Sequence, residues 1–580
     1  MNKAPCHPLK SKAKILLSSV FGPYAQNDEY GSRIDNPMEL FHNQVTRVQG
    51  TFSMRMFHPS LGLLMIQENI DAPCTLLDFP ILDRYITELK SKSYDIIGIS
   101  SIIPNLGKVK KMCELIRQYQ PNAIIVVGGH ISNISNLKSR IDADYIVKGE
   151  GIRWFRKYLG EDENAPVKHP SVISGFGSRI LGLGLNSKKV ETAAALIPSV
   201  GCPMGCNFCS TSHLFGGKGK SINFFTSGDD FFSVICNIEK ELGVKSFFIM
   251  DENFLFYKER TLRLLELMIK HKKSWSFRIF SSARIIQSYT DEQLIRLGIS
   301  WIWMGLEGNK SQYSKLAGVD SKSLVKHLQS LGIRVLGSTI IGLEEHTPEN
   351  IQDAIDWAVN HDTDFHQFML YLPIPGTPLY KEHLKQDTLL SEDECALADS
   401  HGQSRFNFRH KHLKDQNELE LLLGAFKTDF KINGPSLLRL IRTMLLGWKN
   451  LKEHTDQCVQ DRIQWEYKLP ISTTYAATTW AIKRWYRHDK HMFNKTSIIL
   501  KDLYDEFGWK TKIISRVLGP AIYILMKLED RRLSRGWTYE PSTQYTKNAA
   551  ATALELDQAI SKNNNVKHNM DIAPALKMEV

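Results

Sequence analysis

The sequence lacks any long hydrophobic run. None of the apolar stretches among its 580 residues reaches the roughly 18 uninterrupted residues that a membrane-spanning helix needs. Its basic start, residues 1–24, has an apolar part of only about six residues and no small-residue cleavage site, which argues against a signal peptide. We therefore expect a cytoplasmic protein. With 42% hydrophobic and 23% charged residues, the composition is typical of a globular chain of two or three domains.

Cysteine is scarce, with nine residues in the whole chain. In a large cytosolic chain, cysteines without motif spacing are reduced and mostly buried small hydrophobic residues. We interpret six in this way: Cys6, Cys74, Cys113, Cys236, Cys395 and Cys458. The other three, Cys202, Cys206 and Cys209, lie within the ten-residue stretch GCPMGCNFCS, directly after a predicted strand.

The chain also lacks a uniform excess of charge. Its net charge of +11 comes almost entirely from residues 401–580, which hold 29 Lys or Arg against 19 Asp or Glu. The same region carries six of the eleven tryptophans, at positions 448, 465, 480, 485, 509 and 537. Basic and aromatic residues together suit a helical lid with a solvated face, a membrane surface or nucleic acid. We favour the lid, then peripheral contact with the inner membrane surface, and rank nucleic acid last.

Residues 14–160 alternate short apolar runs with amphipathic segments. The apolar runs predict five buried strands, at 13–20, 74–79, 94–100, 123–129 and 144–149. Such alternation is typical of an open parallel sheet with helices on both faces, which binds its ligand at the carboxyl ends of the strands. We therefore predict a doubly wound, Rossmann-like α/β domain over residues 1–160. The polar connection 22–58 is long enough to have a function of its own or to cover something.

A second alternating series follows a linker predicted over residues 161–190. Strands are predicted at 193–201, 245–252, 275–282, 301–308, 334–342 and 364–373. Consecutive strand–helix units of this kind predict a partial (β/α)6 barrel of TIM type over residues 191–400, with its chemistry where strands end and loops begin. The pattern then predicts a mostly α-helical region over residues 401–545 and an unstructured tail over residues 546–580.

Three clustered thiols allow several chemistries. Structural zinc needs four ligands and no second cysteine pair follows Cys209, although His213 is close enough to be considered. A redox dithiol would use two of the cysteines and leave the third without a role. Iron–sulfur chemistry agrees best, because thiolates are its usual ligands and a four-iron cluster held by three of them leaves one iron free for another ligand.

The motif CxxxCxxC, with Phe208 before the last cysteine and in the first loop of a six-unit barrel, resembles that of the radical S-adenosylmethionine (SAM) superfamily. The resemblance implies that Cys202, Cys206 and Cys209 hold a [4Fe-4S] cluster whose fourth iron binds SAM. It also implies that an electron, supplied by a reductant such as flavodoxin or ferredoxin, cleaves SAM to a 5'-deoxyadenosyl radical. The barrel would shield this radical from water.

Other strand ends carry residues where this family binds SAM. The acidic group 251–253 would contact the methionyl amine, and the glycines of 337–342 would pack beside adenine. The resemblance implies SAM contacts for Phe208, Asp251, Glu252, Asn253, Ser282, Arg284, Glu307, Gly337 and Gly342. Each has an ordinary alternative, such as a helix cap for 251–253, a surface charge for Arg284, or close packing for the glycines.

The five-strand domain ahead of the barrel resembles the cobalamin-binding domain of one radical SAM subclass. Small residues at its strand ends allow the backbone to approach a large ligand, although a generic nucleotide or flavodoxin-like domain would carry them too. The resemblance implies cobalamin contacts for Ser100, Ser101, Gly128, Gly129, His130, Gly149, Glu150 and Gly151.

One motif of some cobalamin proteins is missing. The sequence has no DxHxxG, by which a histidine is donated to cobalt; Asp364-Phe-His366 comes nearest but lacks the glycine. His130 follows two glycines, and we interpret it as a hydrogen-bonding loop residue. The resemblance therefore implies cobalamin bound base-off, with no axial histidine.

Together these features predict a cobalamin-dependent radical SAM methyltransferase that delivers a SAM-derived methyl group, through methylcobalamin, to an unactivated carbon of a small metabolite or lipid. Three alternatives stay open. The same parts serve rearrangement or cyclisation in some relatives, and others attach sulfur to tRNA or protein using a second cluster. The third is a non-catalytic iron–sulfur or cobalamin-sensing module.

Overall fold

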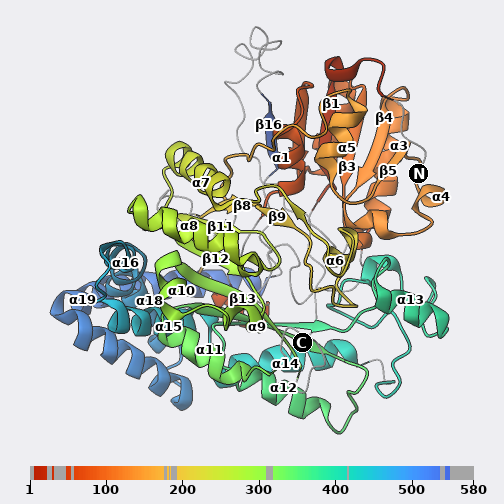
Figure 1. Cartoon of the computed structure of the whole chain (residues 1–580). Coiled ribbons are helices and arrows are strands. Elements are labelled where there is room, and N and C mark those ends of the chain that lie inside the picture. Colours follow the sequence, from red (N-terminus) through yellow and green to blue (C-terminus); the bar gives the residue numbers. More distant parts are fainter. Residues whose placement is uncertain are drawn as a thin grey trace.

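A computed structural model describes residues 6–22, 29–31, 47–53, 58–174, 179–181, 183–184, 193–308, 318–414, 417–535 and 543–548. Its first layer is a sheet of parallel strands in the order β2-β1-β3-β4-β5, drawn in red and orange in Figure 1. The strands are β1 (Ile15–Ser19), β2 (Cys74–Asp78), β3 (Ile96–Ser100), β4 (Ile124–Gly128) and β5 (Tyr145–Val147). All five coincide with the predicted strands, since buried parallel strands form continuous apolar runs.

Helices cover both faces of this sheet. On one face α1 (Leu61–Glu68) and α5 (Gly151–Tyr158) pack with Leu17, Leu76 and Val126 in one core cluster. On the other, α2 (Leu82–Ser91) and α3 (Leu106–Tyr119) pack with Leu16 and other strand residues in a second cluster. The predicted doubly wound, Rossmann-like architecture is therefore confirmed.

The chain returns to this sheet near its end. Strand β16 (Gln544–Lys547) pairs antiparallel with β2 and covers that edge of the sheet (Figure 1). Asn548 adds two side-chain bonds, donating to the carbonyl of Ala72 (2.9 Å) and accepting from the amide of Cys74 (3.1 Å). The unstructured tail predicted from residue 546 therefore begins too early, because a four-residue polar strand carries no periodic signal of its own. Residues 549–580 lie outside the described part.

The barrel domain has a single sheet whose strands follow one another in chain order. They are β8 (Ala193–Leu196), β11 (Ser246–Ile249), β12 (Ser276–Phe280), β13 (Ile299–Glu307), β14 (Arg334–Ile341) and β15 (Phe365–Leu370), all parallel. The helices α7 (Gly228–Leu242), α8 (Lys258–Lys270), α10 (Asp291–Leu297), α11 (Ser321–Ser330) and α12 (Ile351–Val359) alternate with them. Because β8 and β15 remain the two edges of the sheet, the barrel is open, as predicted.

Helices form the third part of the chain, coloured teal to blue in Figure 1. They include α13 (Pro378–Lys385), α14 (Glu418–Asn433), α15 (Ser436–Leu451), α16 (Gln457–Ile463), α17 (Leu469–Ser472), α18 (Thr474–Trp485) and α19 (Lys490–Leu533). Their own hydrophobic core is built around Leu438, Ile441, Ile482 and Leu503. None of the helices in the described part has both the length and the apolar character needed to cross a membrane.

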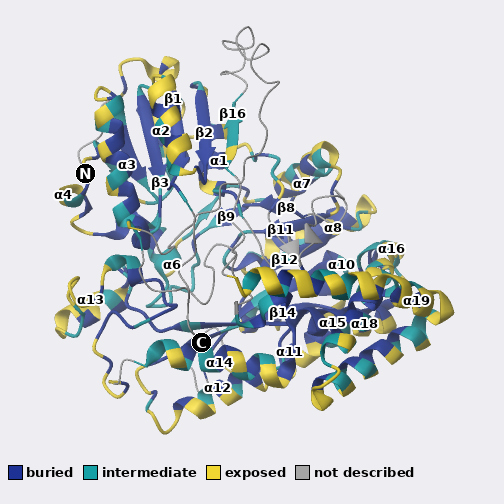
Figure 2. Cartoon of the chain, turned by 180° about the vertical axis from the view of Figure 1, so that it is seen from behind, coloured by how far each residue is buried: buried dark blue, intermediate teal, exposed yellow. Residues whose placement is uncertain are grey.

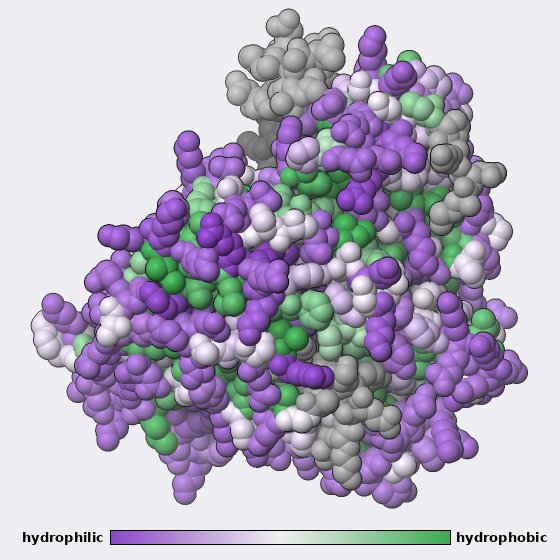
Figure 3. All heavy atoms as spheres, viewed as in Figure 1, coloured by the Kyte–Doolittle hydropathy of each residue, from purple (hydrophilic) through white to green (hydrophobic). Residues whose placement is uncertain are grey.

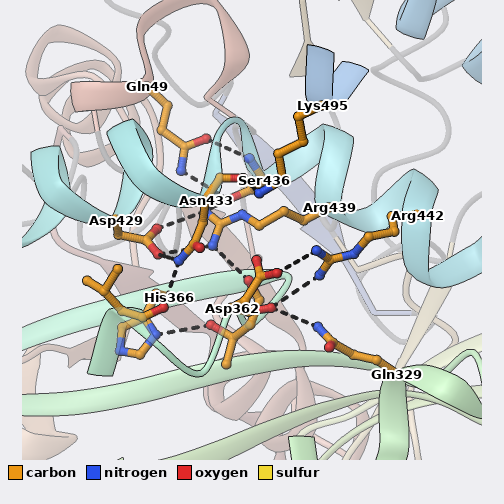
Figure 4. Close-up of polar contacts among 12 residues, drawn as sticks. Gln49, Gln329, Asp362, His366, Asp429, Asn433, Ser436, Arg439, Arg442 and Lys495 are labelled. Atoms are coloured by element: carbon orange, nitrogen blue, oxygen red, sulfur yellow. Dashed lines mark hydrogen bonds and ion pairs between the residues drawn. The ribbon is translucent and has the colours of Figure 1, made fainter. Parts of the chain in front are cut away.

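A buried polar network fixes these helices to the amino ends of the barrel strands (Figure 4). The Arg439 guanidinium lies 2.8 Å from Asp429 and donates to the carbonyl of Thr363 at 2.7 Å. Asp364 accepts from the Thr443 hydroxyl at 2.6 Å and from the amide of Val335 at 2.8 Å. Most of these contacts cross between a strand end and a helix or join two helices, and the bond from Val335 to Asp364 joins the starts of β14 and β15. We call this set of contacts the base network.

Part of the predicted connection 22–58 also reaches the helices. Gln49 exchanges two hydrogen bonds with Ser436, at 3.0 and 3.1 Å, and the Thr51 hydroxyl donates to the carbonyl of Met526. Phe52 is buried between aromatic residues of α18 and its end. The segment 47–53 therefore joins the first domain to the helical part.

Candidate functional site

A cavity of about 590 Å³ lies where the first domain meets the carboxyl ends of the barrel strands. Residues 102–104 and His130 of the first domain form one wall, and the cysteine loop forms another. Phe280, Trp303, Ile340 and the end of β15 form the barrel side. Both domains therefore contribute to one site, at the end of the strands where the sequence predicts it.

The cysteine loop begins after the short strand β9 (Ser199–Val200) and ends in α6 (Ser210–Leu214). Cys202, Cys206 and Cys209 all line the cavity. Ser212 fastens the loop, because its hydroxyl donates to the carbonyl of Cys202 at 2.7 Å and its amide donates to the Cys209 sulfur at 3.5 Å. Burial, with the neighbouring Cys209 and Cys206, raises the pKa of Cys202 to about 11. Three thiols this close are stable as thiolates only beside a strong positive charge.

The donor set agrees with an iron–sulfur cluster. Among the described residues no group of three or more His, Cys, Asp or Glu is arranged to hold a single metal ion. The ring of His213, considered as a zinc ligand, lies 3.2 Å from the carbonyl oxygen of Cys206 through its Nε2. Soft thiolates facing a cavity with room for an inorganic cluster are the ligands that iron–sulfur sites use.

Glu252 and Asn253 follow β11 and both line the cavity. Among the described residues, Oε2 of Glu252 has no hydrogen-bond partner. Burial, reinforced by Asp251 and opposed by a backbone hydrogen bond from Gly201, raises the pKa of this carboxyl to about 7. A buried carboxylate without an opposite charge beside it is costly unless a cationic ligand pairs with it. Asn253 is held in place, since its Oδ1 accepts from the Ser281 hydroxyl at 3.0 Å and from the amide of Ser282 at 3.1 Å.

The other predicted SAM contacts divide into two groups. Phe208, Ser282 and Glu307 line the cavity, and Glu307 has a left-handed backbone (φ 56°), a strained conformation common at functional sites. The remaining four lie away from the cavity wall. Asp251 is buried against Arg260 (2.9 Å), Arg284 is exposed, and Gly337 and Gly342 pack against side chains of the barrel and of Phe406.

A second cavity, of about 320 Å³, lies at the carboxyl ends of β3, β4 and β5. Most of the predicted cobalamin residues line it: Ser100, Gly128, Gly129, His130, Gly149, Glu150 and Gly151. Gly129 has φ 85°, and a Cβ there would lie 2.6 Å from the carbonyl oxygen of Ser101, so this turn requires glycine. Ser101 itself is buried behind the turn and does not line the cavity.

His130 lines both cavities and therefore lies at their junction. Burial lowers its pKa to about 4, so the ring is neutral at pH 7. His366 lies elsewhere, inside the barrel wall on β15, where its two nitrogens lie 3.0 Å from the hydroxyls of Thr363 and Thr339 (Figure 4). His366 lines neither cavity, which agrees with the prediction that the sequence lacks a DxHxxG histidine able to bind cobalt.

His401 is a site residue that the sequence does not reveal. It lines the larger cavity, is 7% exposed, and neither ring nitrogen has a hydrogen-bond partner. Burial lowers its pKa to about 4. The segment around it lies along the end of β15, because the amide of Leu370 donates to the carbonyl of Gly402 at 2.9 Å. No periodicity marks this segment, so only the fold brings it to the cavity.

Two family models match the two domains. Residues 51–158 match the B12 binding domain, and residues 196–358 match the Radical SAM superfamily. Residues 51–158 are therefore a B12-binding domain and residues 196–358 a radical SAM domain. Radical SAM domains hold a [4Fe-4S] cluster at which SAM binds, and B12-binding domains bind cobalamin.

Several proteins resemble this chain over most of their length. An uncharacterized methyltransferase of Pyrococcus horikoshii is 24% identical over 60% of this chain and 82% of its own. The bacteriochlorophyllide d C-12(1)-methyltransferase of Chlorobaculum tepidum is 26% identical over 61% of this chain and 78% of its own. The structure of TsrM from Kitasatospora setae, a radical SAM methyltransferase with cobalamin and a [4Fe-4S] cluster bound, aligns with a TM-score of 0.48 and 13% identity, over 79% of this chain and 99% of that one.

Proposed function

We propose that this protein is a cobalamin-dependent methyltransferase that adds a SAM-derived methyl group to an unactivated carbon of a small metabolite or lipid. The supporting observation is the single cavity that the three cysteines and the B12-binding domain line together. When bound, the cluster supplies the electron that cleaves SAM and the cobalamin carries the methyl group. The two relatives named above are both called methyltransferases, which supports this reaction, although two other similar proteins are cyclases.

The residues divide the work of binding. Cys202, Cys206 and Cys209 would hold the cluster. The Glu252 carboxylate, whose Oε2 has no hydrogen-bond partner among the described residues, would pair with the amino group of SAM. The small residues lining the second cavity would receive part of the cobalamin. His130, at the junction, would donate or accept a hydrogen bond without binding cobalt. We propose that the cobalamin is held with its nucleotide base off the cobalt and without a histidine in place of that base.

The composition of the cavity wall supports a largely apolar, uncharged substrate. Among the described residues no Lys or Arg lines the larger cavity, whereas Ile102, Trp303, Met369 and Leu372 do. An anionic group buried there would lack a cationic partner. A neutral imidazole such as that of His401 can donate from one nitrogen and accept at the other, which suits a hydroxyl or carbonyl of the substrate.

Sulfur attachment with a second cluster is disfavoured by the positions of the remaining cysteines. Cys74 and Cys113 belong to the core clusters on opposite faces of the first sheet, and Cys6 is exposed. Burial raises the pKa of Cys113 to about 12, which disfavours the thiolate that iron needs. Rearrangement or cyclisation remains the alternative outcome within the same cavity.

The test begins with anaerobic purification with iron and cobalamin, followed by reduction with SAM. We expect an iron–sulfur and a corrinoid spectrum and the formation of 5'-deoxyadenosine. With methyl-labelled SAM and cell extract, each methylated product should accompany one 5'-deoxyadenosine, one methionine and one S-adenosylhomocysteine, because the substrate hydrogen leaves with the deoxyadenosyl group. Substrate turnover without label in the product would overturn methyl transfer in favour of rearrangement.

A His401→Leu variant tests the substrate side separately. It should still cleave SAM, since His401 is not among the residues proposed for SAM, but labelled product should fall relative to 5'-deoxyadenosine. His401→Asn, which keeps a donor and an acceptor, should recover part of this coupling. Equal loss of both products in both variants would contradict the substrate role.

A further inference from the structure

The outer side of α19 exposes a continuous apolar stripe. Beyond Gly508, where the helix kinks (φ 75°), apolar residues recur at intervals of about four, which places them on one side of a helix with 3.6 residues per turn. We call them the α19 outer face: Trp509, Ile513, Val517, Ile524 and Leu528, which are 68%, 52%, 67%, 59% and 44% exposed. The opposite side of the helix, including Ser515 and Met526, is buried against the helical core.

Basic residues accompany this stripe. Residues 509–535 contain seven Lys or Arg and two acidic residues, and one of the acidic residues, Glu529, is buried. Lys510, Lys512 and Arg516 are exposed near the first part of the stripe, and Lys527 and Arg531 near its end. In Figure 3 the surface over α19, at the lower left, accordingly mixes hydrophobic and hydrophilic atoms.

The position of α19 leaves this face accessible. The helix lies at the outer edge of the molecule, on the side away from the B12-binding domain, in both Figure 1 and Figure 2. Its packing partner within the molecule is mainly α18, on the buried side. The face is thus an unpartnered amphipathic surface rather than the wall of a cavity.

We propose that the α19 outer face binds the surface of an anionic lipid bilayer. Apolar side chains in the middle of an exposed helix face, with Lys and Arg around them, are the arrangement by which interfacial helices lie in the headgroup region. Trp509 at one end suits this boundary, since indole has an apolar body and a polar N–H. The inference is independent of the proposed reaction, because α19 does not line either cavity.

Charge favours this occupant over a second copy of the chain. A two-fold dimer through α19 would bring the same basic residues of both copies together, and like charges repel. An anionic bilayer instead attracts each of them, and the protein as a whole carries a net charge of +11.

The experiment is co-sedimentation of the full-length, cofactor-loaded protein with vesicles. We expect binding to phosphatidylglycerol mixed with phosphatidylcholine, little binding to phosphatidylcholine alone, and release as salt is raised. A Val517→Glu/Ile524→Glu variant should weaken binding at least about tenfold. It removes two apolar side chains that the bilayer would bury, and it adds two negative charges that the anionic lipid headgroups repel. Lys510→Gln/Lys512→Gln/Arg516→Gln should weaken it similarly on anionic vesicles.

The matched control is Ile81→Glu/Leu384→Glu, which places the same charges at two equally exposed apolar positions outside α19. The control should bind as the unchanged protein does, and all variants should keep their iron and cobalamin content. Equal loss in the control, or no loss in the α19 variants, overturns the proposal. So does a dimer in sedimentation velocity that Val517→Glu/Ile524→Glu dissociates without any vesicle binding, since the face would then bind a second copy.

Discussion

At the carboxyl ends of the barrel strands, two buried side chains form no ion pair among the described residues, whereas at the amino ends the buried Asp429 faces Arg439. Single atoms at the amino ends, such as Arg439 Nε, also lack a hydrogen bond within the described part. Glu252 and His401 are directed at the larger cavity with unpartnered atoms. In the base network, the buried Asp429 pairs with the buried Arg439. Both ends are buried, so burial alone does not identify a binding site. Groups without partners at one end await ligands, and paired groups at the other attach one domain to the next.

The largest expected effect is the loss of activity on substitution of a cysteine at the larger cavity. Cys206→Ala should abolish 5'-deoxyadenosine formation and reduce bound iron, because a four-iron cluster with two protein thiolates is poorly held. The unfolding midpoint of the protein purified without iron should stay unchanged, since Cys206 contributes little packing at the cavity wall. Cys236→Ala, on α7 and away from the cavity, is the control and should keep both iron and activity. SAM cleavage by Cys206→Ala would contradict the site.

A substitution in the base network should instead lower the stability of the protein and leave SAM binding unchanged. Although burial opposes it, Arg439 lowers the pKa of Asp429, so this carboxylate is charged at neutral pH. Asp429→Asn should cost about 3–5 kcal/mol in the free energy of unfolding, because it leaves Arg439 buried without its counter-charge. Urea unfolding measures this, and SAM affinity should not change.

The double variant Asp429→Leu/Arg439→Met separates pairing from packing. It should recover most of the lost stability, since replacing a whole buried ion pair by apolar residues is often neutral. If the single variant cost under about 1 kcal/mol, or the double variant cost more than the single one, the base network would not be the attachment that its geometry indicates.

Glu252→Gln tests whether the Glu252 carboxylate serves SAM. The neutral isostere removes a charged hydrogen bond, which is worth about 1.5–3 kcal/mol, so SAM should bind about ten- to a hundredfold more weakly. Equilibrium binding to the protein with its cluster measures this. Glu345→Gln, at an exposed position beyond β14, is the control. If Glu252→Gln bound SAM as tightly as the unchanged protein, the Glu252 carboxylate would have no role in SAM binding, and the two ends of the barrel strands would no longer differ in this way.

The smallest expected effect is a change in the pH dependence of stability. It concerns a histidine whose two ring nitrogens both have hydrogen-bond partners. His169 lies 2.8 Å from the Pro170 carbonyl through Nδ1 and accepts from the amide of Ile197 at Nε2 (2.9 Å), which requires the neutral ring. Burial lowers its pKa to about 4, below the value near 6.5 of the unfolded chain. The unfolded state therefore takes up a proton first as the pH falls, and the stabilisation present above pH 6.5 is lost toward pH 4.

His169→Gln should reduce this pH dependence. Between pH 7.5 and pH 5 the unchanged protein should lose about 1–2 kcal/mol more stability than the variant, as followed by urea midpoints. The control variant is Asn164→Gln, at an exposed position without a titratable side chain, and its pH profile should match that of the unchanged protein. An identical slope in His169→Gln would show that this ring does not titrate with unfolding.

Much of the fold could be predicted because its strands are buried on both sides. Continuous apolar runs such as 123–129 and 193–201 identified strands of both sheets, and the cysteine spacing identified the loop that matters. Side-chain direction could not be predicted: Asp251 and Glu252 are neighbours, yet one pairs with Arg260 and the other lines the cavity. His401 depends on backbone pairing beside β15, which leaves no pattern in the sequence.

The return of the chain to its first sheet, through β16, constrains how the protein admits its large cofactor. The first domain is tied to the rest at three places, by the segment 47–53, by the segment after α5 and by β16 on the edge of β2. Any separation of the domains must therefore pivot about these attachments or release β16. A chain truncated after residue 535 would lose one attachment and leave the hydrogen-bonding edge of β2 open to pairing with other chains. We therefore expect the last described strand to affect both cofactor entry and solubility, although it touches neither cavity.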